Sequence, residues 1–226
     1  MKLQIKLTLK YQRRQSLFFY SLKCWHGYRN KYVQISNICF INGGKKMNIK
    51  DKYLNFYYET IGEIEEPIID PKKTALLLVD LQNEFVLRDF GEALQFKASG
   101  EWERWIPFHD RLDDIVIPNN KKLLDFFRAN NMAVTYGRIA CLRDDGEDRS
   151  PVQKSEGWNN MLMPVDSYSA QMIDELSPLK NEIVVNKTTD SVCNGTNYLT
   201  LLRFMGIDTV VVTGIVTDQC VACTVR

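Results

Sequence analysis

Four short apolar segments, separated by stretches with helical spacing, constrain the fold of this chain more than any other feature of its sequence. They are TALLLVD (74–80), MAVTYGRI (132–139), EIVVNK (182–187) and DTVVVTGI (208–215). Short runs of this kind, rich in β-branched residues and lacking polar alternation, are typical of parallel strands that are buried on both faces. The sequence therefore predicts four core strands.

The segments between these runs carry helix signals. In PNNKKLLDFFRA (118–129) the leucines and phenylalanines recur near helical spacing, and NGTNYLTLLRFMG (194–206) ends on a glycine, a common helix terminator. A further helix is expected after Thr217. Strands that alternate with helices predict an α/β fold, a three-layer α-β-α sandwich around a mostly parallel, doubly wound sheet. Two long connections, 86–114 and 140–181, are expected to be loops with a functional role.

Charge divides the chain into two unequal parts. The whole sequence has 29 Lys+Arg against 28 Asp+Glu, whereas residues 1–46 contain no acidic residue at all. We therefore interpret 1–46 as a basic N-terminal extension outside the fold and 47–226 as one folded domain. Two explanations of the extension remain open, an organelle-targeting presequence and a translated upstream segment with Met47 as the functional start.

Composition also narrows the class of protein. A formal net charge of +1 gives no indication of nucleic-acid binding, and no apolar run approaches the ~18 residues that a membrane span needs. The six cysteines are scattered, and no secretory signal precedes them. We expect reduced thiols, a cytoplasmic location and a small-molecule partner.

Three chemically capable residues fall at the carboxyl ends of the expected strands. Asp80 ends the first strand, Lys187 ends the third, and Cys220 follows the fourth by one short turn. Ligands of open parallel sheets bind at that edge, so the three should converge. A helix N-terminus and a nearby ammonium lower a thiol pKa, and a carboxylate can accept the thiol proton. Taken singly, each residue also has an ordinary structural interpretation: Asp80 as a turn cap, Lys187 as a solvated strand end, and Cys220 as a buried, packed thiol. The combination of the three favours covalent catalysis.

The surrounding motifs carry a family resemblance. VDLQNEF (79–85), VVNKTTDS (184–191) and TGIVTDQCVACTVR (213–226) resemble the signature stretches of isochorismatase-like cysteine hydrolases, in the same order and separation. The most specific pattern, G-[IV]-x-[TA]-x-x-C-V, is matched from Gly214 to Val221. The resemblance covers about residues 74–226 and implies hydrolysis of a small amide or carbamoyl C–N bond through a thioester.

The resemblance also implies roles for particular residues. It assigns Asp80, Lys187 and Cys220 as a catalytic triad, and it implies a cis peptide between Ile215 and Val216. The N–H groups of Val216 and Cys220 would form an oxyanion hole. Gln82, beside Asp80, is similar to the metal-free members that act on carbamoyl compounds such as biuret, ureidoacrylate or N-carbamoylsarcosine.

Other substrate contacts are suggested by position alone. They are Arg138 at the end of the second strand, and Trp158 and Asn159 in the second long connection. Isochorismatases that cleave a vinyl ether lack the nucleophilic cysteine, so its presence here favours an amide substrate.

The chain departs from the family pattern at its end. Members continue with further strands, whereas this sequence stops at Arg226 within the expected Cys220 helix, so the last strands of the sheet are expected to be missing. The alternative function is then a truncated, catalytically inactive domain that acts as an interaction module through an open sheet edge. Family members suggest a homo-oligomer.

Histidine content yields the first testable prediction. Zinc-binding relatives of the nicotinamidase type use an Asp-x-His motif plus another His, and this chain has only His26 and His109. We expect no metal and no cofactor: the purified protein carries no stoichiometric zinc, and chelators leave its hydrolase activity intact. Elemental analysis that finds about one zinc per chain would show this prediction to be wrong.

Overall fold

The computed structural model of the protein describes residues 69–157 and 160–226, together with the backbone of four short strands at 20–23, 33–34, 40–42 and 45–47. Its main sheet has the strand order β2-β1-β8-β5-β6-β7. The centre of this sheet consists of β5 (Thr74–Val79), β6 (Ala133–Ile139), β7 (Ile183–Lys187) and β8 (Thr209–Gly214). These four strands pair in parallel, as the sequence predicts.

Short antiparallel strands complete the strand inventory of the described residues. The backbone of β1 (Tyr20–Lys23) lies along the outer edge of β8 and also pairs with β2 (Val33–Gln34). A separate hairpin joins β3 (Phe40–Asn42) to β4 (Lys45–Met47). The sequence gives residues 1–46 no part in the fold, whereas the structure places β1 beside β8. The domain boundary at residue 47 stays a prediction.

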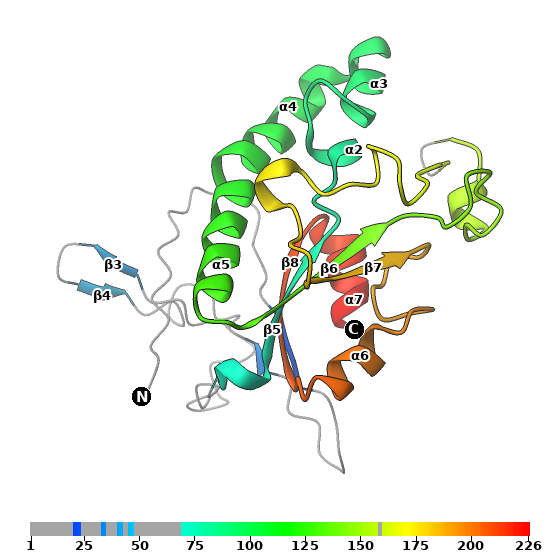
Figure 1. The fold of residues 1–226 in the computed structure, drawn as a ribbon. Helices are drawn as coiled ribbons and strands as arrows, with labels where there is room; N and C mark the ends of the chain where they lie inside the picture. The colour runs from blue at the N-terminus through cyan, green and yellow to red at the C-terminus, as the bar shows by residue number, and fades with distance from the viewer. Residues whose placement is uncertain (1–19, 24–32, 35–39, 43–44, 48–68, 158–159) are drawn as a thin grey trace, which may run out of the picture.

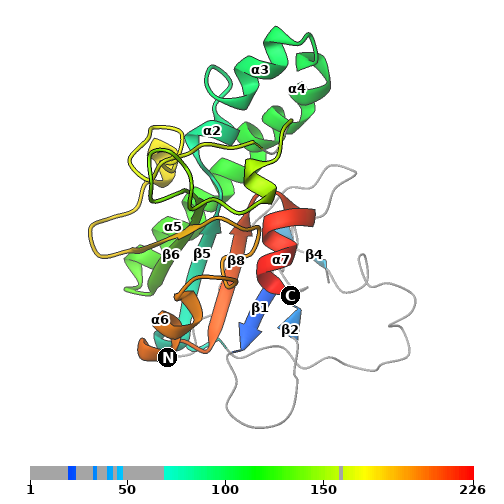
Figure 2. The same cartoon turned by 90° about the vertical axis from the view of Figure 1, so that its right-hand side faces the viewer.

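Helices cover both faces of the central strands (Figures 1 and 2). Helix α5 (Ile117–Ala129) packs on one face, and α6 (Tyr198–Phe204) and α7 (Ala222–Val225) pack on the other. The arrangement confirms the α-β-α layers expected from the sequence. Among the described residues, no helix is both long enough and apolar enough to cross a membrane.

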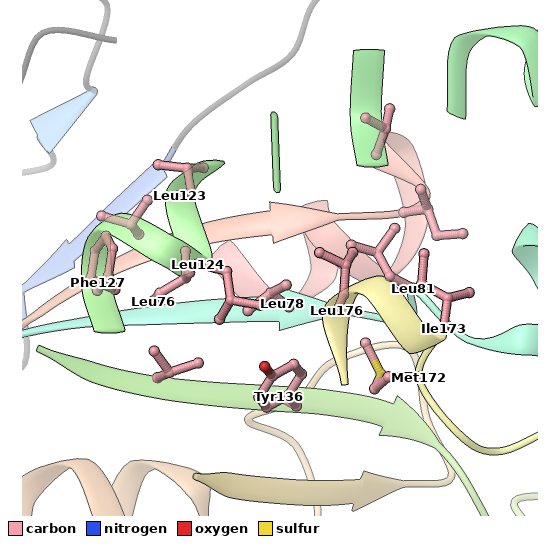
Figure 3. Close-up of a cluster of buried hydrophobic side chains, with 14 of the residues drawn as sticks. Leu76, Leu78, Leu81, Leu123, Leu124, Phe127, Tyr136, Met172, Ile173 and Leu176 are labelled. Atoms are coloured by element: carbon pink, nitrogen blue, oxygen red, sulfur yellow. The ribbon is translucent and has the colours of Figure 1, made fainter. Parts of the chain in front are cut away.

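One of the two apolar cores fills the space between the sheet and α5. Figure 3 shows Leu76 and Leu78 of β5 beside Tyr136 of β6, with Leu124 and Phe127 of α5 above them. All five side chains are almost completely buried. Burial of a leucine or phenylalanine contributes roughly 1.5–3 kcal/mol, so these residues fix α5 to the sheet. A second core holds α6 and α7 on the opposite face.

The first long connection is helical, which the sequence analysis did not anticipate. It contains α2 (Asn83–Val86), α3 (Glu92–Ala98), α4 (Trp102–Arg111) and the π-helical segment η3 (Leu112–Val116), which runs directly into α5. These helices are stabilised by contacts between aromatic residues that lie on different helices. Trp105 of α4 stacks on Phe96 of α3 with ring centroids 4.0 Å apart, so the two helices stabilise each other.

The second long connection is mostly irregular, as expected. Its described residues, 140–157 and 160–181, form two short 3-10 turns, η4 (Val152–Lys154) and η5 (Asp174–Leu176). Another such turn, η2 (Pro71–Lys73), precedes β5. After β8 the chain forms the π-helical turn η6 (Thr217–Val221) and then α7. The helix expected after Thr217 therefore begins with a wider turn.

Strand order singles out one end of the sheet as the expected ligand-binding end. From β5 the chain steps outward to β6 and β7, and then returns to the opposite side of β5 to form β8. The sheet thus changes winding direction between β5 and β8. Open α/β sheets bind ligands beyond the carboxyl ends of their strands at such a switch point.

Gly214, the last residue of β8, yields a stability prediction. Its φ is +128°, and a Cβ placed there would lie 2.0 Å from the carbonyl oxygen of Val79 on β5. Gly214→Ala should therefore lower the free energy of unfolding by about 3 kcal/mol, since backbone cannot easily move aside. Gly206→Ala is the matched control, because Gly206 also has positive φ (+69°) but open space around it. Its cost should be about 1 kcal/mol. Equal losses for the two variants in urea unfolding would contradict the argument.

Candidate active site

Asp80 directly follows β5 and lies at the switch point. The residue is buried, with 2 % of its surface exposed. Its φ is +53°, a conformation in which aspartate is one of the commoner residues after glycine. Its N–H donates to the carbonyl of Gly137 on β6, over 2.9 Å. The backbone therefore leaves the strand in a fixed direction and turns the carboxylate toward the neighbouring strand ends.

Lys187, the last residue of β7, is 1 % exposed and lies at the centre of the site. Its Nζ donates to Asp80 Oδ2 at 2.8 Å, to the carbonyl oxygen of Thr189 at 3.2 Å and to Cys220 Sγ at 3.4 Å. An ammonium has three N–H donors, and here each has an acceptor. The structure thus brings together the three residues that the sequence nominates as a triad.

Cys220 lies in η6 and is 6 % exposed. It belongs to the same buried apolar cluster as Ile139, Ala140, Met163 and Val192. Apolar side chains on one side and the Asp80–Lys187 ion pair on the other leave the Cys220 sulfur largely desolvated.

Burial and charge set the acid-base properties of the three groups. Burial raises the pKa of Asp80, an effect only partly offset by the attraction of Lys187. Burial acts to lower the pKa of Lys187, but Asp80 and Cys220 together outweigh it, so this pKa is raised. The site therefore contains a firmly protonated ammonium beside a carboxylate that is more basic than usual.

The acidity of Cys220 differs from the sequence-based expectation. A lowered thiol pKa is expected from a helix N-terminus and a neighbouring lysine, but burial and then the charge of Asp80 raise the pKa of Cys220 more than Lys187 lowers it. In addition, the residue lies within a π-helical turn rather than in the first turn of a long α-helix. The resting thiol is therefore protonated, and a base must take its proton during reaction.

Two atoms at the site lack hydrogen-bond partners among the described residues. Asp80 Oδ1 is buried without one, while Asp80 as a whole interacts with the Cys220 thiol. The N–H of Val216, between β8 and η6, has no acceptor in residues 69–157 and 160–226. The peptide bond that joins Ile215 to Val216 is cis. These atoms are one acceptor and one donor that no described residue satisfies.

The side-chain amide of Gln82, which the sequence suggests as a substrate contact, is bonded to backbone groups. Its side-chain amide donates to the carbonyls of Ile139 at 2.8 Å and Ala170 at 3.0 Å, and its oxygen accepts from the N–H of Ile139 at 2.8 Å. The residue is fully buried. Both donors and the oxygen are engaged by backbone, so Gln82 joins the end of β6 to the second long connection.

Arg138, also suggested as a substrate contact, lies near the end of β6. Side chains alternate faces along a strand, so Arg138 shares the α5 face with Tyr136, whereas Lys187 projects from the opposite face with Val185. Its guanidinium donates to Asn186 Oδ1 and Gln171 Oε1, both at 2.8 Å. These bonds tie β6 to β7 and to the second connection.

The remaining expected contacts, Trp158 and Asn159, lie outside the described residues. Sequence reasoning overlooked Thr189, whose backbone carbonyl is one of the three acceptors around Lys187. The only sequence signal for it is its place two residues after the lysine.

No metal-binding cluster is present in the part of the chain that the structure describes, where no three His, Cys, Asp or Glu residues group as ligands. His109 of α4 is buried, packs against Trp102 with ring centroids 4.9 Å apart, and has an unpartnered Nδ1. The four cysteines within residues 69–157 and 160–226 are free thiols.

Known proteins share both this sequence pattern and this architecture. The isochorismatase domain family matches residues 74–226. The chain is 30 % identical over 158 residues to an uncharacterized isochorismatase family protein, YwoC, from Bacillus subtilis, covering 70 % of this chain and 71 % of YwoC. It is 28 % identical over 176 residues to the ureidoacrylate amidohydrolase RutB of Agrobacterium fabrum, covering 71 % and 72 % of the two chains.

Two further comparisons concern enzymes of related name. The chain is 31 % identical over 123 residues to an N-carbamoylsarcosine amidase from Arthrobacter sp, covering 50 % of this chain and 44 % of that one. The solved structure of a cysteine hydrolase from Pseudomonas syringae pv. phaseolicola superposes with a TM-score of 0.56 at 28 % identity, covering 70 % of this chain and 66 % of that chain.

The fold and the site thus define a parallel α/β domain of the cysteine-hydrolase type. The chain belongs to the isochorismatase domain family.

The electrostatics of the site predict opposite effects of two substitutions on Cys220. Because the Asp80 charge raises the thiol pKa and Lys187 lowers it, Asp80→Asn should lower the pKa of Cys220 and Lys187→Met should raise it. The pH dependence of Cys220 alkylation, followed by peptide mass mapping, measures both shifts. Cys141, a buried cysteine beyond the end of β6, is the internal control and should not shift. Shifts of the same sign would contradict this account.

Proposed function

We propose that this protein is a cysteine hydrolase that cleaves an amide or carbamoyl C–N bond of a small molecule through a thioester on Cys220. The observation that carries the proposal is the buried contact of Lys187 with both the Asp80 carboxylate and the Cys220 sulfur, at 2.8 and 3.4 Å. A nucleophile, a base and a fixed cation within one small space are the requirements of covalent acyl transfer.

In the first step, Asp80 accepts the thiol proton. Lys187 holds Oδ2, which leaves the unpartnered Oδ1 for this transfer. The sulfur then attacks the substrate carbonyl carbon, and the π electrons move to the carbonyl oxygen. The N–H of Val216 donates to this oxyanion, with the N–H of Cys220 proposed as the second donor.

In the second step, the tetrahedral intermediate collapses. The C–N bond breaks, and the departing nitrogen takes the proton from Asp80, leaving a thioester on Cys220. Asp80 is then free to activate a water molecule that hydrolyses the thioester and restores the thiol. The raised pKa of Asp80 suits both directions, because a more basic carboxylate removes a proton more readily from a weakly acidic thiol.

Lys187 supplies the positive charge that this cycle requires. Proton transfer from Cys220 to Asp80 moves the negative charge from one neighbour of Lys187 to the other. Since burial strengthens charge interactions, an ammonium in contact with both groups stabilises the charge in either position. Its raised pKa keeps it protonated throughout.

The substrate class rests on relatives and on the surroundings of the sulfur. Two relatives bear the names ureidoacrylate amidohydrolase and N-carbamoylsarcosine amidase, and both names denote carbamoyl or ureido substrates. The enclosed position of Cys220 among apolar side chains favours a small substrate. Ammonia release from biuret, ureidoacrylate, N-carbamoylsarcosine and simple primary amides is the direct assay.

Substitutions at the site should separate chemistry from folding. Cys220→Ala should abolish turnover, and Asp80→Asn should lower kcat by about 10² or more, the usual scale of acid-base catalysis. Circular dichroism and gel filtration would establish that both variants fold. A folded Asp80→Asn variant with near-normal kcat would mean that the proton goes to another group.

The pH dependence of kcat/KM follows from the direction of the pKa shifts. Asp80 must be ionised to accept a proton and its pKa is raised, so activity should fall on acidification at a pH above the ordinary range of aspartate. Lys187 has a raised pKa, so its loss of charge should not limit activity below the ordinary range of lysine. An acidic limb at or below the ordinary aspartate pKa would remove Asp80 as the base.

A further inference from the structure

The turn between β7 and α6 contains an asparagine directly followed by a glycine, Asn194–Gly195, and both residues are exposed. Gly195 has a φ of +75°, and no atom lies within 4 Å of the position that a Cβ would occupy. The space into which a side chain at residue 195 would project is therefore open.

The two groups that can react in this turn are not engaged elsewhere. Within residues 69–157 and 160–226, neither the side-chain amide of Asn194 nor the N–H of Gly195 has a hydrogen-bond partner. The main-chain carbonyl of Asn194 is the bonded group, and it accepts from Thr189 Oγ1 at 3.3 Å. Since glycine imposes little restriction on its own backbone, the nitrogen can approach the amide carbon of Asn194.

We propose that Asn194 is a site of spontaneous deamidation in the folded protein. The Gly195 peptide nitrogen attacks Cγ of Asn194, a new N–C bond forms, and the Cγ–Nδ2 bond breaks. The departing nitrogen takes up the peptide proton and leaves as ammonia, which closes a succinimide ring. Water then opens the ring at either carbonyl, giving aspartate or isoaspartate, and no oxidant, reductant or enzyme is required.

The position of Asn194 connects this reaction to the triad. The effect on catalysis argued in this paragraph rests on the proposed function. The Thr189 hydroxyl has two acceptors within reach, the carbonyls of Ser191 at 3.2 Å and Asn194 at 3.3 Å, and the carbonyl of Thr189 accepts from Lys187 Nζ. Isoaspartate inserts a methylene into the main chain at residue 194 and adds a negative charge. Both changes displace the Asn194 carbonyl, which removes one support of the loop that holds Lys187.

The modification is tested by incubating the folded protein in mildly alkaline buffer and mapping its peptides by mass, with isoaspartate distinguished by methyltransferase labelling. Asn197 is the internal control, because it is exposed in the same segment but is followed by Tyr198. Conversion at Asn194 should be about tenfold faster or more than at Asn197, since only Asn194 precedes glycine. Asn194→Gln should remove the signal.

Two results would overturn the proposal or its consequence. An unconverted Asn194 in the folded protein, under conditions that convert a synthetic peptide of the same sequence, would show that the fold blocks the attack.

Amide turnover should fall in proportion to the isoaspartate fraction, and the Asn194→Gln variant should retain its turnover during incubation. Full turnover in completely converted protein would overturn the link to Lys187. Absence of any amidase activity would instead count against the proposed function and leave the mass result unaffected.

Discussion

The rest of the site depends on the burial of one ammonium group. Lys187 is 1 % exposed, and an unpaired charge in such a position would cost several kcal/mol. The structure meets this requirement with Asp80, the Thr189 carbonyl and the Cys220 sulfur, which come from the ends of β5, β7 and β8. The need to surround one cation therefore fixes the relative positions of three strand ends. The residues that satisfy it are those that covalent hydrolysis needs.

This dependence also explains the chemistry of the resting state. Burial, and then the charge of Asp80, raise the pKa of Cys220 more than the attraction of Lys187 lowers it. In the mechanism that we propose, the cysteine stays neutral until a substrate carbonyl is present to accept its electrons. Such an arrangement protects the thiol from unwanted alkylation and oxidation, because reactivity follows the thiolate.

The sequence predicts the parallel core and the convergence of the triad because both follow from local patterns. Apolar runs mark the strands, and a polar residue at the end of each run must lie at the same edge of the sheet. The hydrogen-bond partners of Gln82 and Arg138 could not be predicted, for the opposite reason. Their hydrogen bonds reach Ala170 and Gln171 in the second long connection, and no local pattern reveals such long-range partners. Likewise, the helices between residues 86 and 114 depend on packing between aromatic side chains of different segments, such as Phe96 and Trp105.

The central claim is that hydrolysis passes through a thioester on Cys220. It is tested most directly by adding hydroxylamine during turnover of substrates that share one acyl or carbamoyl group but differ in the leaving amine. A common thioester predicts the same ratio of hydroxylamine adduct to hydrolysis product for every leaving amine, because the choice between the two nucleophiles occurs after the amine has departed. A ratio that changes with the leaving amine would mean that water attacks the substrate directly, and would contradict the account.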